Sequence, residues 1–310
     1  MATRLLREEL RRAAPGRPSA FTLGTFDGVH RGHQFLIHLL EERAAARGLA
    51  TGVITLHPHP LTVVRPGTEV TYLTSLEERM ELLAALGVDI VAPVTFSSEV
   101  SQTGADEFVQ LMVDELDLRF LLIGPDSALG RGREGAGERL LEIGAAKGVE
   151  VEFAPVESED GHKLGSSDVR EALAAGDVAR VNYLLGRRFS LRGPIVRGAE
   201  RGRTIGFPTA NMAIAPDRAL PGFGVFAACA FVDEGNFAAA VNIGRRPTFD
   251  NGAPTIEAHL LDFEGDIYGH QLRLEFVQRL RGEVKFDGIQ ALIDQIAKDV
   301  AATRAVAVCG

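Results

Sequence analysis

The stretch SAFTLGTFDGVHRGHQFLIHLL, residues 19–40, carries the pattern that decides the fold of the first half of the chain. Its first eight residues, SAFTLGTF, carry no charge and are few enough to form a buried strand. From residue 33 to residue 48 the apolar side chains recur at helical spacing, at Phe35, Leu36, Leu39 and Leu40. A glycine-rich turn therefore joins a strand to a helix. Ligands of open α/β sheets bind at such junctions, beyond the carboxyl ends of the strands.

The same alternation continues from this stretch to residue 186. A capping box of Ser75 and Glu78 opens one of the predicted helices. Repeated strand–helix–strand order at these lengths predicts βαβ units and a mostly parallel sheet. The expected strands cover residues 50–56, 89–96, 118–124 and 149–156, and the expected helices cover 75–87, 105–117, 138–148, 167–176 and 178–186.

Beyond Gly186 the pattern changes, because no helical period returns until Asp287. Short strand-like segments separated by turn residues are typical of an antiparallel barrel. A terminal amphipathic helix follows at 288–305, with Ile289, Leu292, Ile293 and Ile296 on its apolar side. We therefore expect two domains, residues 1–186 and 187–310. The expected strands of the second domain are 190–198, 225–234, 237–244, 255–263 and 271–280.

The composition gives no support for two classes of partner, nucleic acid and membranes. The chain has 310 residues, is 45% hydrophobic and has a formal net charge of −9. A negative chain has no general electrostatic attraction to nucleic acid or to an anionic membrane. Its longest apolar run, residues 225–232, is far too short to span a bilayer. We expect small-molecule substrates, no nucleic acid and no membrane, and leave homo-oligomer formation open.

The cysteines and the N-terminus bear on the compartment. Cys229 and Cys309 are 80 positions apart, which gives no disulfide framework and no zinc-type spacing. A reducing cytoplasm is therefore expected. The arginine-rich segment 1–18 contains Glu8 and Glu9, unlike an acidic-poor transit peptide. It is expected to form a short solvated helix that ends near Pro15.

His30 and His33 in the opening stretch allow three interpretations. Free amides at the start of a helix form an anion site, and histidines there can donate to a phosphate. The pair can instead serve only as turn and cap residues. A zinc site would need further ligands such as His57 and His59, but the prolines in HPHP predict an extended segment there.

The string GRTIGFPTAN, residues 202–211, is the strongest motif of the second half. Gly206 allows a sharp bend, and Pro208 stiffens the chain. Thr209 and Asn211 are two apart on an extended segment and aim oxygen atoms to one side, an arrangement suited to Mg²⁺. An ordinary barrel corner is the alternative. Further along, Glu257 and His259 alternate on one strand face, where a surface carboxylate is the alternative to a catalytic base.

The string G-x-F-D-x-x-H-x-G-H resembles the signature of the nucleotidylyltransferases. Three further strings, at residues 124–135, 162–177 and 184–211, follow in the order seen in the bifunctional riboflavin kinase/FMN adenylyltransferases, also called FAD synthetases. The resemblance extends from about residue 21 to about residue 303. It implies a Rossmann-like α/β nucleotidylyltransferase domain followed by a riboflavin kinase β-barrel domain with a terminal helix.

For the first half the resemblance implies transfer of AMP from ATP to FMN, giving FAD and pyrophosphate. His30, His33 and Arg170 would stabilise the charge that moves toward the leaving group. Asp126 would lie in a loop on the flavin side, and Lys163 occupies a position where a basic residue is expected. The remaining residues that the resemblance places at the nucleotide are Gly24, Phe26, Asp27, Gly32, Ser166 and Ser167.

For the second half it implies phosphorylation of riboflavin to FMN by ATP. Glu257 would accept the proton of the riboflavin 5′-hydroxyl, and Thr209 and Asn211 would hold Mg²⁺. Around the substrates it places Gly206, Pro208, Asn242, Arg246, Arg281, Lys285 and Phe286.

Leu56, Ser127, Leu129 and Gly165 stand where the family has other residues. Two alternatives therefore stay open. One is a riboflavin kinase whose adenylyltransferase half is impaired and mainly binds nucleotide. The other is a flavin or nucleotide sensor without activity.

Overall fold

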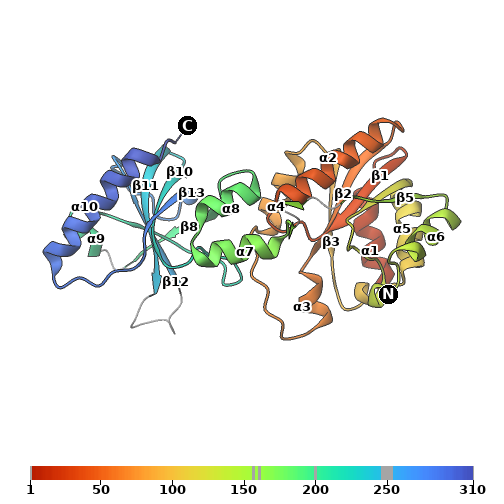
Figure 1. Ribbon diagram of the computed structural model, residues 1–310, viewed down its shortest axis with the longest axis horizontal. Coiled ribbons are helices and arrows are strands. Elements are labelled where there is room, and N and C mark those ends of the chain that lie inside the picture. Colours follow the sequence, from red (N-terminus) through yellow and green to blue (C-terminus); the bar gives the residue numbers. More distant parts are fainter. Residues whose placement is uncertain (1, 156–157, 160–161, 199–200, 246–253, 310) are drawn as a thin grey trace. The chain divides into compact units, whose positions relative to one another are not determined.

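The computed structural model describes residues 2–155, 158–159, 162–198, 201–245 and 254–309 (Figure 1). The chain divides into two compact units, Met1–Ser166 and Ser167–Gly310, which are called the N-terminal and C-terminal units below. In the described residues no helix is long and apolar enough to cross a membrane.

The N-terminal unit is built on a five-stranded parallel sheet with the strand order β3-β2-β1-β4-β5. This confirms the parallel sheet that the alternating pattern predicts. The central strand takes the first residues of the opening stretch and is buried along most of its length. The strands are β1 (Ser19–Gly24), β2 (Ala50–His57), β3 (Ile90–Thr95), β4 (Leu118–Ile123) and β5 (Glu150–Phe153).

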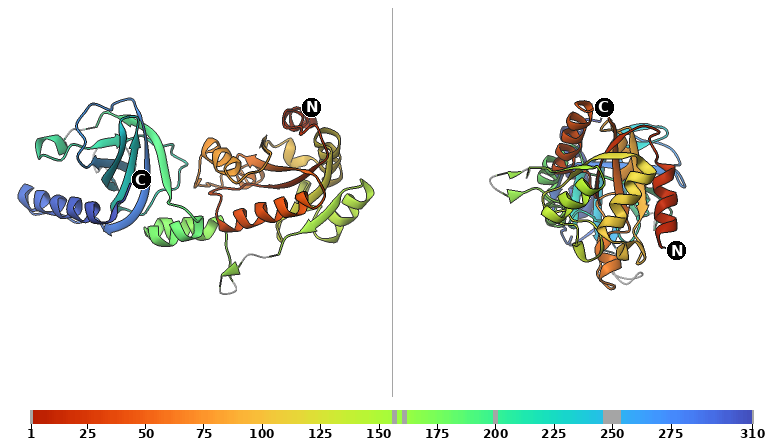
Figure 2. Two further views of the ribbon diagram at one scale, coloured as in Figure 1. Left: turned by 90° about the horizontal axis from the view of Figure 1, so that it is seen from above. Right: turned by 90° about the vertical axis from the view of Figure 1, so that its right-hand side faces the viewer.

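Helices cover both faces of this sheet, as a parallel sheet requires. On one face, α2 (Arg31–Ala45) and α4 (Leu76–Ala84) pack on a core that includes Phe120. On the other face lie α1 (Ala2–Arg12), α5 (Ala105–Leu116) and α6 (Glu138–Ala146). Figure 2 shows α2 running along the sheet.

Two expectations for the N-terminal unit need correction. The predicted solvated helix exists as α1, but Leu6 and Leu10 are fully buried, so one of its faces belongs to the core. The HPHP segment is not extended throughout, because Pro60 opens the short helix α3 (Pro60–Val64). Proline is tolerated at a first helical position, where its missing N–H would have no intrahelical partner.

The described loops of the N-terminal unit contain a helix cap, two 3₁₀ turns and a pair of short strands. The predicted capping box is present: Ser75 Oγ accepts from the Glu78 N–H at 3.1 Å, and Glu78 accepts from the Ser75 N–H at 2.7 Å. The 3₁₀ turns are η1 (Val100–Gln102) and η2 (Arg131–Arg133), and β6 (Ser158–Glu159) pairs with β7 (His162–Lys163).

The C-terminal unit contains the closed antiparallel barrel that the second half of the sequence predicts, with the order β10-β11-β12-β9-β8-β13. The rings of Phe189 and Phe226 pack on Phe276 inside it, with centroids 5.9 and 5.7 Å away. Its strands are β8 (Ser190–Val196), β9 (Ala210–Met212), β10 (Gly224–Val232), β11 (Gly235–Arg245), β12 (Pro254–Leu260) and β13 (Gln271–Arg281).

Two helices, α7 (Ser166–Ala175) and α8 (Val178–Leu185), precede the barrel. Hydrogen bonds attach both to β13: Asn182 Nδ2 donates to the Phe276 carbonyl at 3.0 Å, and Arg279 donates to the Ala175 carbonyl at 3.1 Å. The boundary expected after Gly186 therefore lies inside the second compact unit. The four-residue helix α9 (Arg201–Thr204) opens the GRTIGFPTAN region.

The terminal helix α10 (Ile289–Val306) packs along β10, β11 and β13 (Figure 2). Of its predicted apolar residues, Leu292, Ile293 and Ile296 are half-buried, whereas Ile289 in the first turn is 61% exposed. The buried residues of the helix are Asp299 and Thr303. Asp299 accepts three contacts of 2.8–3.1 Å from the Arg281 guanidinium, which explains why a polar side chain faces the barrel.

The cysteines also differ from expectation, because Cys229 and Cys309 form a disulfide with a Cα–Cα distance of 5.5 Å. Cys229 lies on buried β10, and Cys309 follows α10. Spacing along the chain could not show this, since the barrel brings together residues 80 positions apart.

Candidate active sites

A cavity of about 280 Å³ opens at the carboxyl ends of the N-terminal sheet. Its walls come from the ends of β1, β4 and β5. The strand order reverses between β1 and β4, because β2 and β3 follow on one side of β1, and β4 and β5 lie on the other side. Ligands of doubly wound sheets bind at such switch points. The predicted residues that line the cavity are Gly24, Phe26, His30, Gly32, His33 and Ser166.

The two predicted histidines stack on one another. The His30 and His33 ring centroids are 3.7 Å apart, and the Phe26 ring lies 4.9 Å from His33. His30 precedes α2 as its N-cap residue, and Gly32 and His33 belong to the first turn of that helix. A Cβ at Gly32 would lie 3.2 Å from the Leu164 carbonyl oxygen, so the glycine allows the close approach of that chain segment. The structure thus gathers both imidazoles at a helix N-terminus, where anions are favoured.

The turn between β1 and α2 has an unusual backbone. Phe26 and Val29 adopt positive φ angles of 49° and 41°, and Gly28 has a φ of 79°. A positive φ is strained for bulky and β-branched residues. Such a turn persists only where surrounding contacts hold it.

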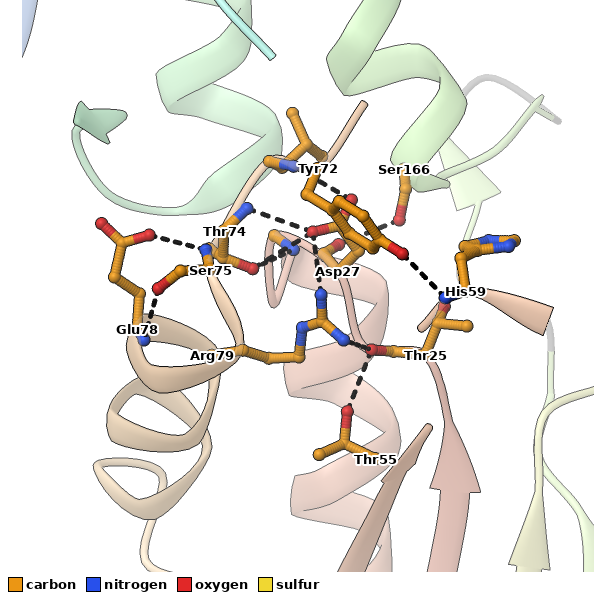
Figure 3. Close-up of polar contacts among 12 residues, drawn as sticks. Thr25, Asp27, Thr55, His59, Tyr72, Thr74, Ser75, Glu78, Arg79 and Ser166 are labelled. Atoms are coloured by element: carbon orange, nitrogen blue, oxygen red, sulfur yellow. Dashed lines mark hydrogen bonds and ion pairs between the residues drawn. The ribbon is translucent and has the colours of Figure 1, made fainter. Parts of the chain in front are cut away.

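Asp27 supplies many of those contacts (Figure 3). Its carboxylate is fully buried and accepts hydrogen bonds from the Leu73 N–H at 3.0 Å and the Thr74 N–H at 3.1 Å. The Thr74 hydroxyl also donates to it at 3.1 Å, and Arg79 forms an ion pair with it at 3.4 Å. The structure therefore places Asp27 in a buried network beside the cavity rather than on the cavity wall.

Ser166 joins a second helix start to the same turn. Its hydroxyl donates to the Asp27 carbonyl oxygen at 2.9 Å, and Ser166 is the first residue of α7. Ser167 and Arg170 follow on this helix, where Arg170 stands four residues after Ser166. The side chain of Lys163 lies outside the described residues, although its backbone forms part of β7.

The loop after β4 forms another wall of the cavity through Gly124, Pro125 and Ser127. The neighbouring carbonyl of Asp126 accepts a hydrogen bond of 2.6 Å from Arg133. Leu129 is only 3% exposed and belongs to the hydrophobic core. Of the positions that differ from the family pattern, Ser127 and Gly165 line the cavity and Leu129 packs inside the unit.

Sequence reasoning missed the residues behind this cavity, chiefly Arg79, Thr74 and Tyr72. Arg79 is fully buried, and it shares the buried side of α4 with Leu83. Arg79 stands four residues before Leu83, and positions i and i+4 lie on one helix face. This spacing was the signal that could have indicated a buried arginine. Nothing local to Thr74 announced its contacts with a turn more than forty positions earlier, and nothing local to Tyr72 announced that its hydroxyl accepts from the His59 N–H at 2.8 Å.

The second site is organised by β12, where Glu257 lies between two amide side chains on adjacent strands. It is opposite Asn211 on β9 and opposite Asn242 on β11. The strand alternates as predicted, with Ile256, Ala258 and Leu260 buried and Glu257 half-buried. The barrel thus brings a carboxylate and two amides from distant segments into one row.

The GRTIGFPTAN segment leads into this row. His259 Nδ1 lies 2.8 Å from the Pro208 carbonyl oxygen, and its ring packs edge-on against Phe207 at 5.5 Å. Gly206 has a φ of 87°, as the predicted sharp bend requires. A Cβ at Gly198 would lie 2.2 Å from the Asn211 amide nitrogen, so backbone from the loop after β8 presses directly on that side chain.

A cavity of about 480 Å³ lies beside the same segment. Pro208 and Thr209 form part of its wall, together with Arg197 and Arg203. Phe263, Ile267 and Tyr268 give it an apolar and aromatic side, and the Arg197 guanidinium lies 5.1 Å from the Tyr268 ring. Cationic groups beside an aromatic surface suit a ligand with a flat ring and phosphates.

The other predicted residues of this half are placed as follows. The Arg281 guanidinium binds Asp299 of α10 and lies 5.7 Å from the Phe286 ring, so much of its hydrogen-bonding capacity serves the helix. Lys285 is exposed. Arg246 lies outside the described residues.

The donors present fit Mg²⁺ better than zinc. Thr209 and Asn211 offer neutral oxygen atoms and Glu257 a carboxylate, which are hard ligands of the kind Mg²⁺ prefers. Zinc sites use nitrogen and sulfur ligands in close groups. Over the ranges that the structure covers, no three His, Cys, Asp or Glu side chains gather in a way that could hold a metal.

Comparison with known proteins gives independent matches to the two units. The sequence pattern of the FAD synthetase family matches residues 13–168, and that of the riboflavin kinase family matches residues 185–307. A solved structure from Streptococcus pneumoniae, titled a macrolide-efflux protein, has a similar fold, with a TM-score of 0.87 and 28% identity. That likeness covers 95% of this chain and 96% of the other.

Curated relatives match almost the whole chain. A protein of Listeria monocytogenes is 36% identical, covering 91% of this chain and 90% of its own length. Proteins of Pseudomonas fluorescens and Escherichia coli are 38% and 36% identical, covering 92% of each chain. All three are named bifunctional riboflavin kinase/FMN adenylyltransferase.

Proposed function

Because the chain belongs to the family of bifunctional riboflavin kinase/FMN adenylyltransferases, we propose that it converts riboflavin to FMN and then FMN to FAD, using ATP in both steps. The observation that carries this proposal is the presence of two separate cavities, each within a segment matched by a different one of the two families. We assign adenylyl transfer to residues 1–186 and riboflavin phosphorylation to residues 187–310.

In the first site an oxygen of the FMN phosphate attacks the α-phosphorus of ATP. The new P–O bond forms as the bond to pyrophosphate breaks, and no covalent enzyme intermediate is needed. Catalysis of this kind depends on alignment and on stabilising charge that moves to the leaving group. His30 and His33 are the donors we assign to that charge, with the first-turn amides of α2. Ser166, Ser167 and Arg170 are assigned to the triphosphate.

In the second site the riboflavin 5′-hydroxyl attacks the γ-phosphorus of ATP, and ADP leaves. We assign Glu257 as the base that takes the hydroxyl proton. Its place between Asn211 and Asn242 supports this role, because amide groups on neighbouring strands can orient a carboxylate and a bound hydroxyl. Positioned bases typically contribute ~10²–10⁴-fold to a rate.

Thr209 and Asn211 are the residues we assign to Mg²⁺, with Glu257 nearby. When bound, the ion would neutralise phosphate charge on the nucleotide. Pro208 and Gly206 shape the segment that presents these oxygens. We assign Arg197 and Arg203, on the wall of the larger cavity, to the phosphates of ATP.

For compartment and partners, we place the enzyme in the cytoplasm, where ATP is supplied, with small molecules as its substrates. This placement no longer rests on the cysteines, since the structure joins them. We propose no nucleic-acid or membrane partner and leave the oligomeric state open.

A single reaction mixture tests the proposal against its two alternatives. Purified protein receives riboflavin, ATP and Mg²⁺, and the flavins are separated by chromatography. Formation of FAD is the expected result. FMN alone would indicate a kinase with an impaired first site. Unchanged riboflavin would contradict the kinase activity, and if a parallel mixture with supplied FMN also formed no FAD, both activities would be contradicted and a sensor favoured.

A further inference from the structure

Arg79 is a charged side chain buried completely within the N-terminal unit. It extends from α4 toward the turn between β1 and α2 (Figure 3). Nη1 donates to the Thr25 carbonyl oxygen at 2.8 Å, and Nη2 forms an ion pair with the Asp27 carboxylate at 3.4 Å. Burying a guanidinium is unfavourable unless its contacts recover the lost hydration, so its partners at this position are informative.

The partners of Arg79 belong to the cavity rather than to the general core. Thr25 lines the cavity and also accepts a hydrogen bond of 3.1 Å from the Thr55 hydroxyl at the end of β2. A further contact of 3.5 Å reaches the Leu56 carbonyl on that strand. The planar guanidinium therefore joins the end of β2 to the residue before the strained turn.

Asp27 extends this network to both helix starts that face the cavity. Its carboxylate holds the 73–74 segment, and the Thr74 hydroxyl in turn accepts from the Gly28 N–H at 3.1 Å. Its carbonyl oxygen accepts from Ser166, the first residue of α7. One residue of the turn thereby connects Arg79 with the segment that leads into α2 and with the N-terminus of α7.

This network surrounds backbone with positive φ angles, at Phe26 before Asp27 and at Val29 after it. Phe26 and Val29 hold conformations that isolated peptides avoid; Phe26 lines the cavity, and Val29 directly precedes His30. Strain of this kind is retained where surrounding contacts over-determine the backbone. Arg79 binds the chain just before the first strained residue, and Thr74 binds it between the two.

We propose that Arg79 is a positioning residue for adenylyl transfer: by binding Thr25 and Asp27 it holds the β1–α2 turn so that His30 and His33 meet the reacting phosphates. This inference rests on the adenylyltransferase function proposed above. Arg79 acts through the turn and not by touching the nucleotide. Its loss should therefore lower the rate of the chemical step more than the affinity for ATP.

The test replaces Arg79 by lysine, which retains the charge but cannot bridge two acceptors with a planar fork. The matched control is Arg43→Lys, since Arg43 also forms an ion pair within the N-terminal unit, with Glu152 at 3.0 Å, away from the turn. For Arg79→Lys we expect kcat for FAD formation to fall by about tenfold to a hundredfold. The KM for ATP should change by less than about threefold. Riboflavin kinase activity of the same preparation should equal that of the control.

Two further measurements separate positioning from folding. In hydrogen–deuterium exchange, the amides of residues 25–30 should exchange faster in Arg79→Lys than in wild type, while those of β4 stay protected. Thr74→Val removes the opposite support of the turn and should give the same kcat-specific loss, so it carries the test if Arg79→Lys does not fold.

The proposal is overturned if Arg79→Lys and Thr74→Val lower kcat no more than Arg43→Lys does. Unchanged exchange at residues 25–30 would overturn it too, and that result needs no activity. Failure of the proposed function looks different, because wild type and Arg43→Lys would then form no FAD either.

Discussion

At Glu257 a carboxylate lies in a row with Asn211 and Asn242 on the two adjacent strands. Most glutamates on a barrel surface have no such neighbours. The same reasoning applies at His33, whose ring stacks on His30 at the start of a helix and beside a cavity. In both cases the proposed role depends on neighbours that the fold supplies. Each can be tested by removing one functional group.

Glu257→Gln should reduce FMN formation by at least about a hundredfold, because the amide cannot accept the hydroxyl proton. FAD formation from supplied FMN should be unchanged. Steady-state assays of the two half-reactions measure this, with Glu234→Gln in the β10–β11 turn as a control for a lost surface carboxylate. Equal loss of both activities would argue against a base that serves only the barrel site.

His33→Ala should have the opposite effect. Loss of a donor to the developing pyrophosphate charge should lower FAD formation by about a hundredfold and leave riboflavin phosphorylation intact. His38→Ala is the matched control, since His38 lies on the same helix but its side chain is 60% exposed. Comparable losses in the two variants would indicate damage to α2 rather than to a site.

At the scale of elements, polar contacts between strands and helices complete what apolar burial begins. Asp89, just before β3, accepts from the Thr51 N–H at 2.8 Å and from its hydroxyl at 3.1 Å, and its own N–H donates back to Thr51 at 3.0 Å. These reciprocal bonds fix where β2 and β3 begin to pair. The hydrogen bonds from Thr51, aided by Arg17, hold the pKa of Asp89 below its ordinary value.

Asp89→Asn should therefore lower the melting temperature in a pH-dependent way. A lowered folded-state pKa means that the carboxylate stabilises the fold above its unfolded pKa of about 4, and that this stabilisation is lost as the pH falls through the folded value. The difference in Tm between wild type and variant should be largest near neutral pH and shrink below about pH 4. A difference that is constant across this range would contradict a role for the charge.

At the scale of the whole molecule, each unit has its own sheet, its own core and its own cavity. In the C-terminal unit the chain end is fastened twice: Arg281 binds Asp299 of α10, and the disulfide joins Cys309 to β10. Arg188 adds a contact of 3.2 Å to the Val308 carbonyl oxygen. The terminal segment is thus part of the barrel unit and not an appendage.

Cys309→Ser should destabilise the C-terminal unit by about 2–4 kcal/mol, because a cross-link across 80 residues restricts the unfolded chain. Thermal unfolding under oxidising conditions measures this. Wild type treated with dithiothreitol should melt like the variant, and the variant itself should not respond. If wild type and Cys309→Ser melt at the same temperature without reductant, the disulfide is absent in solution and the prediction is wrong.

Much of this architecture could be predicted from the chain alone. Apolar periodicity located the five parallel strands, the helices α2, α4, α5 and α6, and most strands of the barrel, because burial on one face imposes its period locally. The capping box at Ser75 and the bend at Gly206 were equally local. Short elements such as β9 and α3 carry too few residues for a period to be recognised.

The candidate sites likewise contain some features that local sequence indicated and others that only the fold brought together. Glycine-rich turns and the histidine pair belong to contiguous strings, so the sequence by itself indicated a phosphate-binding junction and a two-part enzyme. The tertiary structure alone decided that Arg79 supports that junction across 52 positions, that Asp27 faces inward, and that Cys229 meets Cys309. Local patterns follow from the neighbours that the chain itself supplies. Contacts between distant segments depend on how sheets and barrels close, and no local pattern carries that information.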